Sequence, residues 1–130
     1  MRGEVDTGLV TIADARCVWL TTLRRDGSPH TTPAWFLLRN NTFWIASSTA
    51  NLKVRNIVRE PRVLVAVDGT TRNPWVAQGL ATIHHDFDRC GDLISLLADK
   101  YDGWDATDET RDGPRVLIEV PVARWLLRPD

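Results

Sequence analysis

The sequence is poor in cysteine and in lysine. Only Cys17 and Cys90 occur in 130 residues, and they fit no CxxC or zinc-binding pattern. Secreted disulfide scaffolds carry more cysteines than this, so we interpret both as reduced, partly buried thiols, with a disulfide as the alternative. Lys53 and Lys100 are the only lysines among sixteen basic residues, which makes each of them a candidate for a specific role.

The sequence also lacks the features of a membrane anchor, an export signal or a nucleic-acid-binding protein. No apolar run approaches the roughly 20 residues of a membrane-spanning helix, and residues 1–8 lack the basic start and apolar core of a signal peptide. The formal net charge is −1, whereas proteins that bind nucleic acids or membrane surfaces are usually more basic. We therefore expect a cytoplasmic protein that binds neither nucleic acid nor membrane.

Several motifs of enzyme chemistry are missing as well. The chain contains no Walker A loop, no GxGxxG fingerprint and no GxSxG nucleophile elbow. His84, His85 and Asp86 are adjacent, but neighbouring residues of a strand point to opposite faces and cannot easily converge on one ion. The acidic stretch 105–112 has no calcium-loop pattern. We therefore expect no metal site.

What is present is sufficient for one domain spanning residues 1–130. Hydrophobic residues make up 43% and charged residues 25%, both typical of globular domains of this size. Residues 17–23 are rich in strand-forming residues, and Asp26-Gly27 favours a hairpin to a return strand over residues 30–38. Further strands are predicted over residues 42–47, 63–67, 75–84, 116–120 and 123–127, with Gly79 at a bulge or a close approach.

Two segments have helical periodicity, over residues 51–60 and 93–101. The predicted N-cap residues are Ser48 or Thr49 for the first helix and Asp86 or Asp88 for the second. Six to seven strands joined mostly by short turns predict an antiparallel sheet. We therefore predict a mainly β (α+β) fold, a small closed or split β-barrel with two or so peripheral helices.

The junction between the strand 42–47 and the following helix is the first candidate site. Hydroxyl groups, free backbone N–H groups and the positive end of a helix suit a phosphate. Ser47, Ser48 and Thr49 supply the hydroxyls, and Lys53 lies one helical turn further on. The alternative is an ordinary helix cap followed by a solvated basic face, and composition alone favours this alternative.

The segment 31–35 is the second candidate site. Pro33 has no N–H, so it belongs at a sheet edge, at a bulge, or where a ligand replaces a neighbouring strand. With Trp35 beside it, backbone groups could face a planar ring. The alternative is an edge strand with an ordinary core tryptophan, which is favoured without further context. The chain has six tryptophans, and we expect most of them in packing and one or two against a ligand.

Six short segments follow one another along the chain: residues 20–22 (LTT), 26–30 (DGSPH), 33–36 (PAWF), 53–57 (KVRNI), 60–63 (EPRV) and 77–81 (AQGLA). In order and spacing, they resemble the pyridoxamine 5′-phosphate oxidase-like split-barrel superfamily. The Trp-Phe strand and the Lys-x-x-Asn helix are most similar to the flavin/deazaflavin oxidoreductase B group. Many members of that group use the deazaflavin coenzyme F420, and others bind FMN.

The resemblance implies a homodimer with two cofactor sites at the subunit interface. The cofactor phosphate would lie near the strand–helix junction, the ring along residues 32–35, and the second subunit would close the site. Asn56 would orient the phosphate or the helix start, and Trp75 and Gln78 would line the far wall. The implied cofactor-binding residues are Thr32, Pro33, Ala34, Trp35, Ser47, Ser48, Thr49, Lys53, Asn56, Trp75 and Gln78.

The same resemblance implies an oxidoreductase that passes a hydride between reduced F420 and an unsaturated small-molecule substrate. Because the cofactor carries the chemistry, we expect no side chain to act as an obligatory nucleophile. The alternatives are an FMN-dependent reductase or oxidase on the same barrel, a cofactor-binding or storage protein without turnover, and a dimeric barrel with a vestigial pocket.

Overall fold

The computed structural model describes residues 12–129, apart from the Arg89 side chain. The elements are β1 (Val18–Leu23), β2 (Pro29–Ala34), β3 (Phe36–Arg39), β4 (Thr42–Ser48), α2 (Leu52–Arg59), β5 (Arg62–Val67), β6 (Val76–Leu80), β7 (Thr82–His84), a short 3-10 turn η1 (Asp88–Cys90), α3 (Gly91–Lys100) and β8 (Arg115–Leu127). No helix within residues 12–129 is long and apolar enough to cross a membrane. The segment 1–8, where we expect no export signal, lies outside the described residues.

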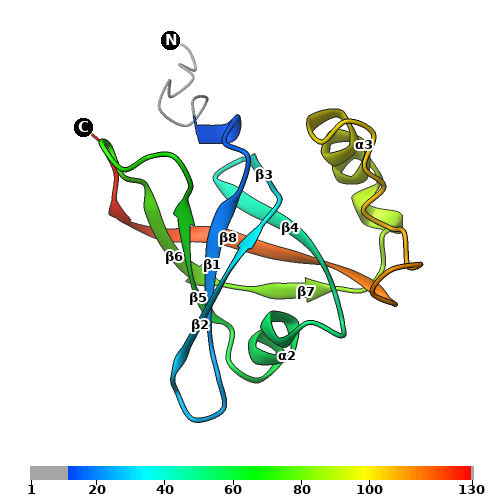
Figure 1. Ribbon diagram of the computed structural model, residues 1–130, viewed down its shortest axis with the longest axis horizontal. Coiled ribbons are helices and arrows are strands. Elements are labelled where there is room, and N and C mark those ends of the chain that lie inside the picture. The colour runs from blue at the N-terminus through cyan, green and yellow to red at the C-terminus, as the bar shows by residue number, and fades with distance from the viewer. Residues whose placement is uncertain (1–11, 130) are drawn as a thin grey trace.

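The strands form one curled antiparallel sheet (Figure 1). Their order is β2-β1-β5-β6-β8-β4-β3, and β7 pairs with β8 beside this path. The two ends of the order, β2 and β3, are separated in the chain by Trp35 alone, so the sheet must curl until its edges approach each other. This arrangement confirms the predicted mainly β split barrel. Helix α2 packs against β1 and β7, and α3 packs against β3.

Alternate residues of the strands fill the interior of the barrel. On β1, Val18 and Leu20 are fully buried, whereas Trp19 between them is 41% exposed. Phe36 and Phe43 are also fully buried, and their ring centroids lie 5.7 Å apart. A second apolar cluster lies beside α3 and consists of Cys90, Leu93, Leu97, Tyr101, Ala106 and Leu117. Both cysteines are free, as expected; Cys90 is buried and Cys17 partly buried.

Four predicted strands have different boundaries in the structure. The return strand over residues 30–38 is broken at Trp35 into β2 and β3, and the strand over residues 75–84 is broken at Ala81, whose N–H donates to Pro61 O. Conversely, the two predicted C-terminal strands are one strand, β8. Pro121 does not interrupt β8 because it lies at the end of the ladder with β4, where a missing N–H is tolerated.

Both predicted helix caps are wrong. The N-cap of α2 is Asn51, and no side chain among the described residues caps that helix. The Asn51 side-chain oxygen instead accepts hydrogen bonds from the hydroxyl of Ser47 and the N–H of Ser48. The N-cap of α3 is Cys90, because a 3-10 turn precedes the helix and separates it from the predicted aspartates.

Candidate functional site

The start of α2 carries a partly buried lysine. Lys53 lies in the first turn of the helix, where the first backbone N–H groups have no side-chain acceptor in the described part of the chain. Burial lowers the pKa of Lys53, the nearby positive charge of Arg115 lowers it further, and Asp112 partly opposes both effects. Positive groups therefore gather here without full compensation.

The serine hydroxyls before α2 are engaged in internal hydrogen bonds. Ser47 and Ser48 are buried, at 3% and 0% exposure. The Ser47 hydroxyl donates to the Asn51 side chain, and the Ser48 hydroxyl donates to the backbone oxygen of Asp112. The N–H of Thr49 donates to Pro114 O at 3.0 Å. The two serines therefore fix the junction to the loop before β8, and Lys53 and the first turn of α2 are the groups available to an anion.

Arg115 is a cation of this region that the sequence analysis missed. It lies opposite Ser48 in the ladder between β4 and β8, and only 10% of its side chain is exposed. Its Nε donates to Ala106 O at 3.1 Å, and its Nη1 lies 3.6 Å from a carboxylate oxygen of Asp112. No sequence motif marks Arg115 among fourteen arginines, because its place depends on the pairing of two distant strands.

Asn56 and Thr22 connect α2 with the inner face of β2. Asn56 is 1% exposed and donates from Nδ2 to the Thr22 hydroxyl at 3.0 Å, which fastens α2 to β1. Thr22 pairs with His30 on β2. The buried atoms His30 Nδ1 and Thr32 Oγ1 have no hydrogen-bond partner within residues 12–129. Buried polar atoms without partners are rare, and they suit a site that a ligand or water completes.

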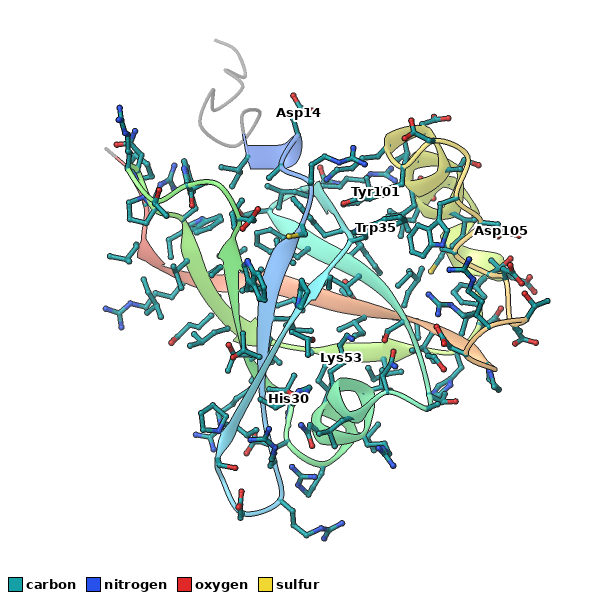
Figure 2. All side chains as sticks on the ribbon, in the orientation of Figure 1. Asp14, His30, Trp35, Lys53, Tyr101 and Asp105 are labelled. Carbon is teal, nitrogen blue, oxygen red and sulfur yellow. The ribbon has the colours of Figure 1, made fainter. Side chains whose placement is uncertain are left out.

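The break at Trp35 forms an aromatic wall (Figure 2). Trp35 is 44% exposed and stacks on Tyr101 with the ring centroids 4.4 Å apart. The Trp104 ring is nearly perpendicular to Trp35, with the two centroids 4.9 Å apart. The Tyr101 hydroxyl accepts from Phe36 N, and Lys100 Nζ donates to Phe36 O at 2.9 Å. The end of α3 therefore holds the backbone where the sheet edge breaks.

Side chains of β2 alternate between exposed and more buried positions, and the two residues before Trp35 follow this alternation. Pro33 is exposed, and Ala34 is buried at 9% exposure. Because β2 is at the end of the strand order, its second edge has no partner strand in the described structure. Of the three settings predicted for Pro33, the structure shows the sheet edge.

Trp75 and Gln78 lie elsewhere in the chain. Trp75 is buried against Trp125, with centroids 5.0 Å apart, and its backbone oxygen accepts from Val67 N at the end of β5 that is remote from α2. Gln78 is exposed on the outer face of the sheet, in a pocket of about 390 Å³ together with Leu64 and Leu80. One chain alone does not bring these two residues to the start of α2.

The adjacent histidines do not form a metal cluster in the described structure. His84 Nε2 and a carboxylate oxygen of Glu119 are 2.8 Å apart, while His85 is exposed. Residues 12–129 contain no group of three or more His, Cys, Asp or Glu side chains placed to hold an ion.

Comparisons with known proteins identify the family and the fold of the chain. The family model for pyridoxamine 5′-phosphate oxidase matches residues 9–128. A search of curated proteins finds no match. A solved structure described as F420 Reductase is 26% identical, with a TM-score of 0.71, and the alignment covers 93% of this chain and 98% of the other.

Two more distant structures show the fold alone. A FAD-binding protein from Mesorhizobium loti is 19% identical, with a TM-score of 0.68 and coverage of 94% and 92% of the two chains. HutZ, a heme storage protein from Vibrio cholerae, is 13% identical, with a TM-score of 0.76 and coverage of 96% and 95%. The family match includes both β2 and the start of α2. This chain therefore belongs to the pyridoxamine 5′-phosphate oxidase family and has its split-barrel fold.

Proposed function

We propose that this protein is an oxidoreductase that binds coenzyme F420 and transfers a hydride to an unsaturated small-molecule substrate. The observation that carries the proposal is the similarity, along nearly the whole of both chains, to a structure described as F420 Reductase. FMN is the second candidate cofactor, because the family includes flavin-type proteins and the same site chemistry suits both.

The start of α2 fits the phosphate that both candidate cofactors contain. Lys53 is partly buried, and burial lowers its pKa because it disfavours the charged ammonium group. A bound anion would stabilise the charged form of Lys53 and would also accept hydrogen bonds from the uncapped first turn of α2. In this proposal Ser47, Ser48 and Asn56 shape the site rather than donate to the phosphate, because internal bonds occupy their side chains. Thr49 is the one predicted hydroxyl that remains a candidate donor.

The unpaired edge of β2 fits a planar ring. Pro33 leaves this edge without an N–H at one position, and Trp35 is fixed by its stacking on Tyr101. The unpartnered atoms of His30 and Thr32 offer polar contacts next to Ala34. When bound, the cofactor would supply the hydride chemistry. The chain's own residues would bind it, orient it and exclude water.

We also propose that the protein is a homodimer whose subunits meet through the outer face of β1, β5 and β6. Leu64 and Leu80 on this face are 37% and 60% exposed, and the pocket beside them is mostly apolar in its lining. A second copy would cover the face and would bring Gln78 toward the partner's site. The cytoplasmic location expected from the sequence stays a prediction.

A binding protein without turnover is the second candidate function. The split barrel of HutZ, described as a heme storage protein, has a TM-score of 0.76 with this chain. The fold is therefore compatible with holding a cofactor without catalysis.

The first test is a titration of the purified protein with F420 and, separately, with FMN, followed by fluorescence. We expect F420 to bind more tightly. Lys53→Ala should weaken binding by about tenfold or more, as expected for the loss of a charge-assisted hydrogen bond. Arg55→Ala is the matched control, because Arg55 is an exposed cation on the same helix and its loss should change affinity less than twofold.

The other outcomes distinguish the alternatives. A preference for FMN would assign the protein to the FMN-dependent branch. Tight F420 binding without reduction of any substrate in a screen of unsaturated compounds would favour the storage protein. Binding of neither cofactor would refute the redox proposal, and unchanged affinity in Lys53→Ala would refute the phosphate placement.

A further inference from the structure

Arg115 and Lys53 are like charges near the start of α2, and the charge of Arg115 contributes to lowering the pKa of Lys53. Arg115 begins β8 directly opposite Ser48, the last residue of β4, and α2 follows Ser48 after a three-residue turn. The side chain of Arg115 is 10% exposed and Lys53 is partly buried. Like charges in such a place repel each other more strongly than they would in water.

The neighbouring acids compensate this pair only in part. Asp112 Oδ2 lies 3.6 Å from Arg115 Nη1, which is beyond hydrogen-bond distance, and 55% of the Asp112 side chain is exposed. Arg111 and Arg115 both interact electrostatically with the Asp108 carboxylate. Asp108 is fully exposed, however, and its carboxylate accepts hydrogen bonds from Thr110. Within residues 12–129, Arg115 therefore forms an ion pair with Asp112 that is longer than a hydrogen bond and partly exposed.

We propose that Arg115 and Lys53 together bind the phosphate of the cofactor, and that Asp112 is an internal competitor that the phosphate displaces from Arg115. This inference rests on the proposed function, because it takes the start of α2 as the phosphate site. It adds Arg115 as a second cation that binds the phosphate, and Asp112 as a competitor that lowers the affinity for it.

The backbone around Asp112 allows its side chain to leave without unfolding the loop. The backbone oxygen of Asp112 accepts a hydrogen bond from the buried Ser48 hydroxyl, and Pro114 O accepts one from Thr49 N. These two bonds fix the segment before β8. The exposed carboxylate can therefore rotate into solvent while the main chain remains in place.

Arg115 is also connected to the aromatic wall. Its guanidinium carbon lies 5.9 Å from the centroid of Trp104, and Trp104 packs edge-on against Trp35. A shift of the guanidinium toward an anion would change the surroundings of Trp104. Tryptophan fluorescence is therefore a second readout, and it does not depend on turnover.

The test uses inorganic phosphate as the probe, with affinity measured by calorimetry and by intrinsic fluorescence. Asp112→Asn should tighten phosphate binding roughly twofold to fivefold, because it removes a competing, partly exposed ion pair. Arg115→Gln should weaken binding by about tenfold or more, and Arg115→Lys should be intermediate. Glu109→Gln and Arg111→Gln are matched controls in the same loop, and their affinities should stay within about twofold of the wild type.

The Asp112→Asn variant keeps the test decisive if Arg115→Gln folds poorly, because a folding defect does not tighten binding. Unchanged affinity in Asp112→Asn, or equal tightening in Glu109→Gln, would overturn the proposal. If Lys53→Ala weakens F420 binding while Arg115→Gln and Asp112→Asn leave it unchanged, the proposed function stands and this inference fails. If phosphate binding follows the expected pattern while neither cofactor binds, this inference about the anion site stands and the redox function fails.

Discussion

At the scale of single residues, the two lysines of the chain lie in different surroundings. Lys53 lies at the start of α2, where the charge of Arg115 acts on it, whereas Lys100 lies 3.5 Å above the centroid of the Phe36 ring and donates to Phe36 O. Burial lowers the pKa of Lys100 to about 8, and Arg16 adds to the effect against the opposing influence of Asp14 and Cys17. Lys100 is therefore a structural cation with a real electrostatic cost.

This cost predicts a pH-dependent stability. Between pH 8 and the ordinary lysine pKa of 10.5, the unfolded chain holds a proton that folded Lys100 has released. The Lys100 contribution to the free energy of unfolding therefore rises with pH across this window. Relative to Lys100→Met, the wild-type protein should become more stable between pH 8 and 10. Urea denaturation of both proteins at each pH measures the difference, and a difference that stays flat or falls would contradict the lowered pKa.

The candidate site was predictable where a residue is scarce or its spacing is distinctive. Lys53 was predicted because it follows hydroxyl residues by one helical turn. Arg115 was not, because its position opposite Ser48 exists only once β8 pairs with β4. The expected phosphate contacts of Ser47 and Ser48 stay untested, but their acceptors, Asn51 and the backbone of Asp112, show why a run of hydroxyls alone is a weak signal.

At the scale of elements, the turns could be predicted from neighbouring residues, whereas the breaks in two predicted strands depend on contacts between residues far apart in the sequence. Gly27 adopts φ +86° in the predicted hairpin, a conformation that favours glycine. The break at Trp35 instead depends on Tyr101 and Lys100, which bind the backbone of Phe36 from more than sixty residues away. No pattern within β2 or β3 contains that information.

Gly79 illustrates an element-scale prediction that the structure confirms. The register between β6 and β8 shifts at this residue, and a Cβ there would lie 2.4 Å from Pro121 O. Gly79→Ala should therefore separate the two strands and lower the free energy of unfolding by about 1–3 kcal/mol. Gly91→Ala is the control, because its Cβ meets nothing within 4 Å at the start of α3 and alanine favours helix. Denaturant melts of both variants measure the effect, and equal stability would contradict the close approach.

At the scale of the whole molecule, the barrel has two different surfaces. Helix α2 packs against β1 and β7, and α3 packs against β3, whereas the face of β5 and β6 that carries Leu64 and Leu80 is exposed to solvent within one chain. Exposed apolar faces of this kind mark association sites more often than chance. Gln78 lies on the same face, which links the proposed dimer to the proposed cofactor site.

The dimer is tested by placing a charge on this face. Leu80→Arg should shift the protein from dimer to monomer at micromolar concentration, because an unpaired charge at a buried interface is costly. It should also weaken F420 binding, since in the proposed dimer the partner subunit completes each site. Leu96→Arg is the matched control: Leu96 is 40% exposed on α3, away from this face. Light scattering after size exclusion measures the assembly. A wild-type monomer, or a Leu80→Arg dimer with unchanged cofactor affinity, would show that the outer face does not complete the site.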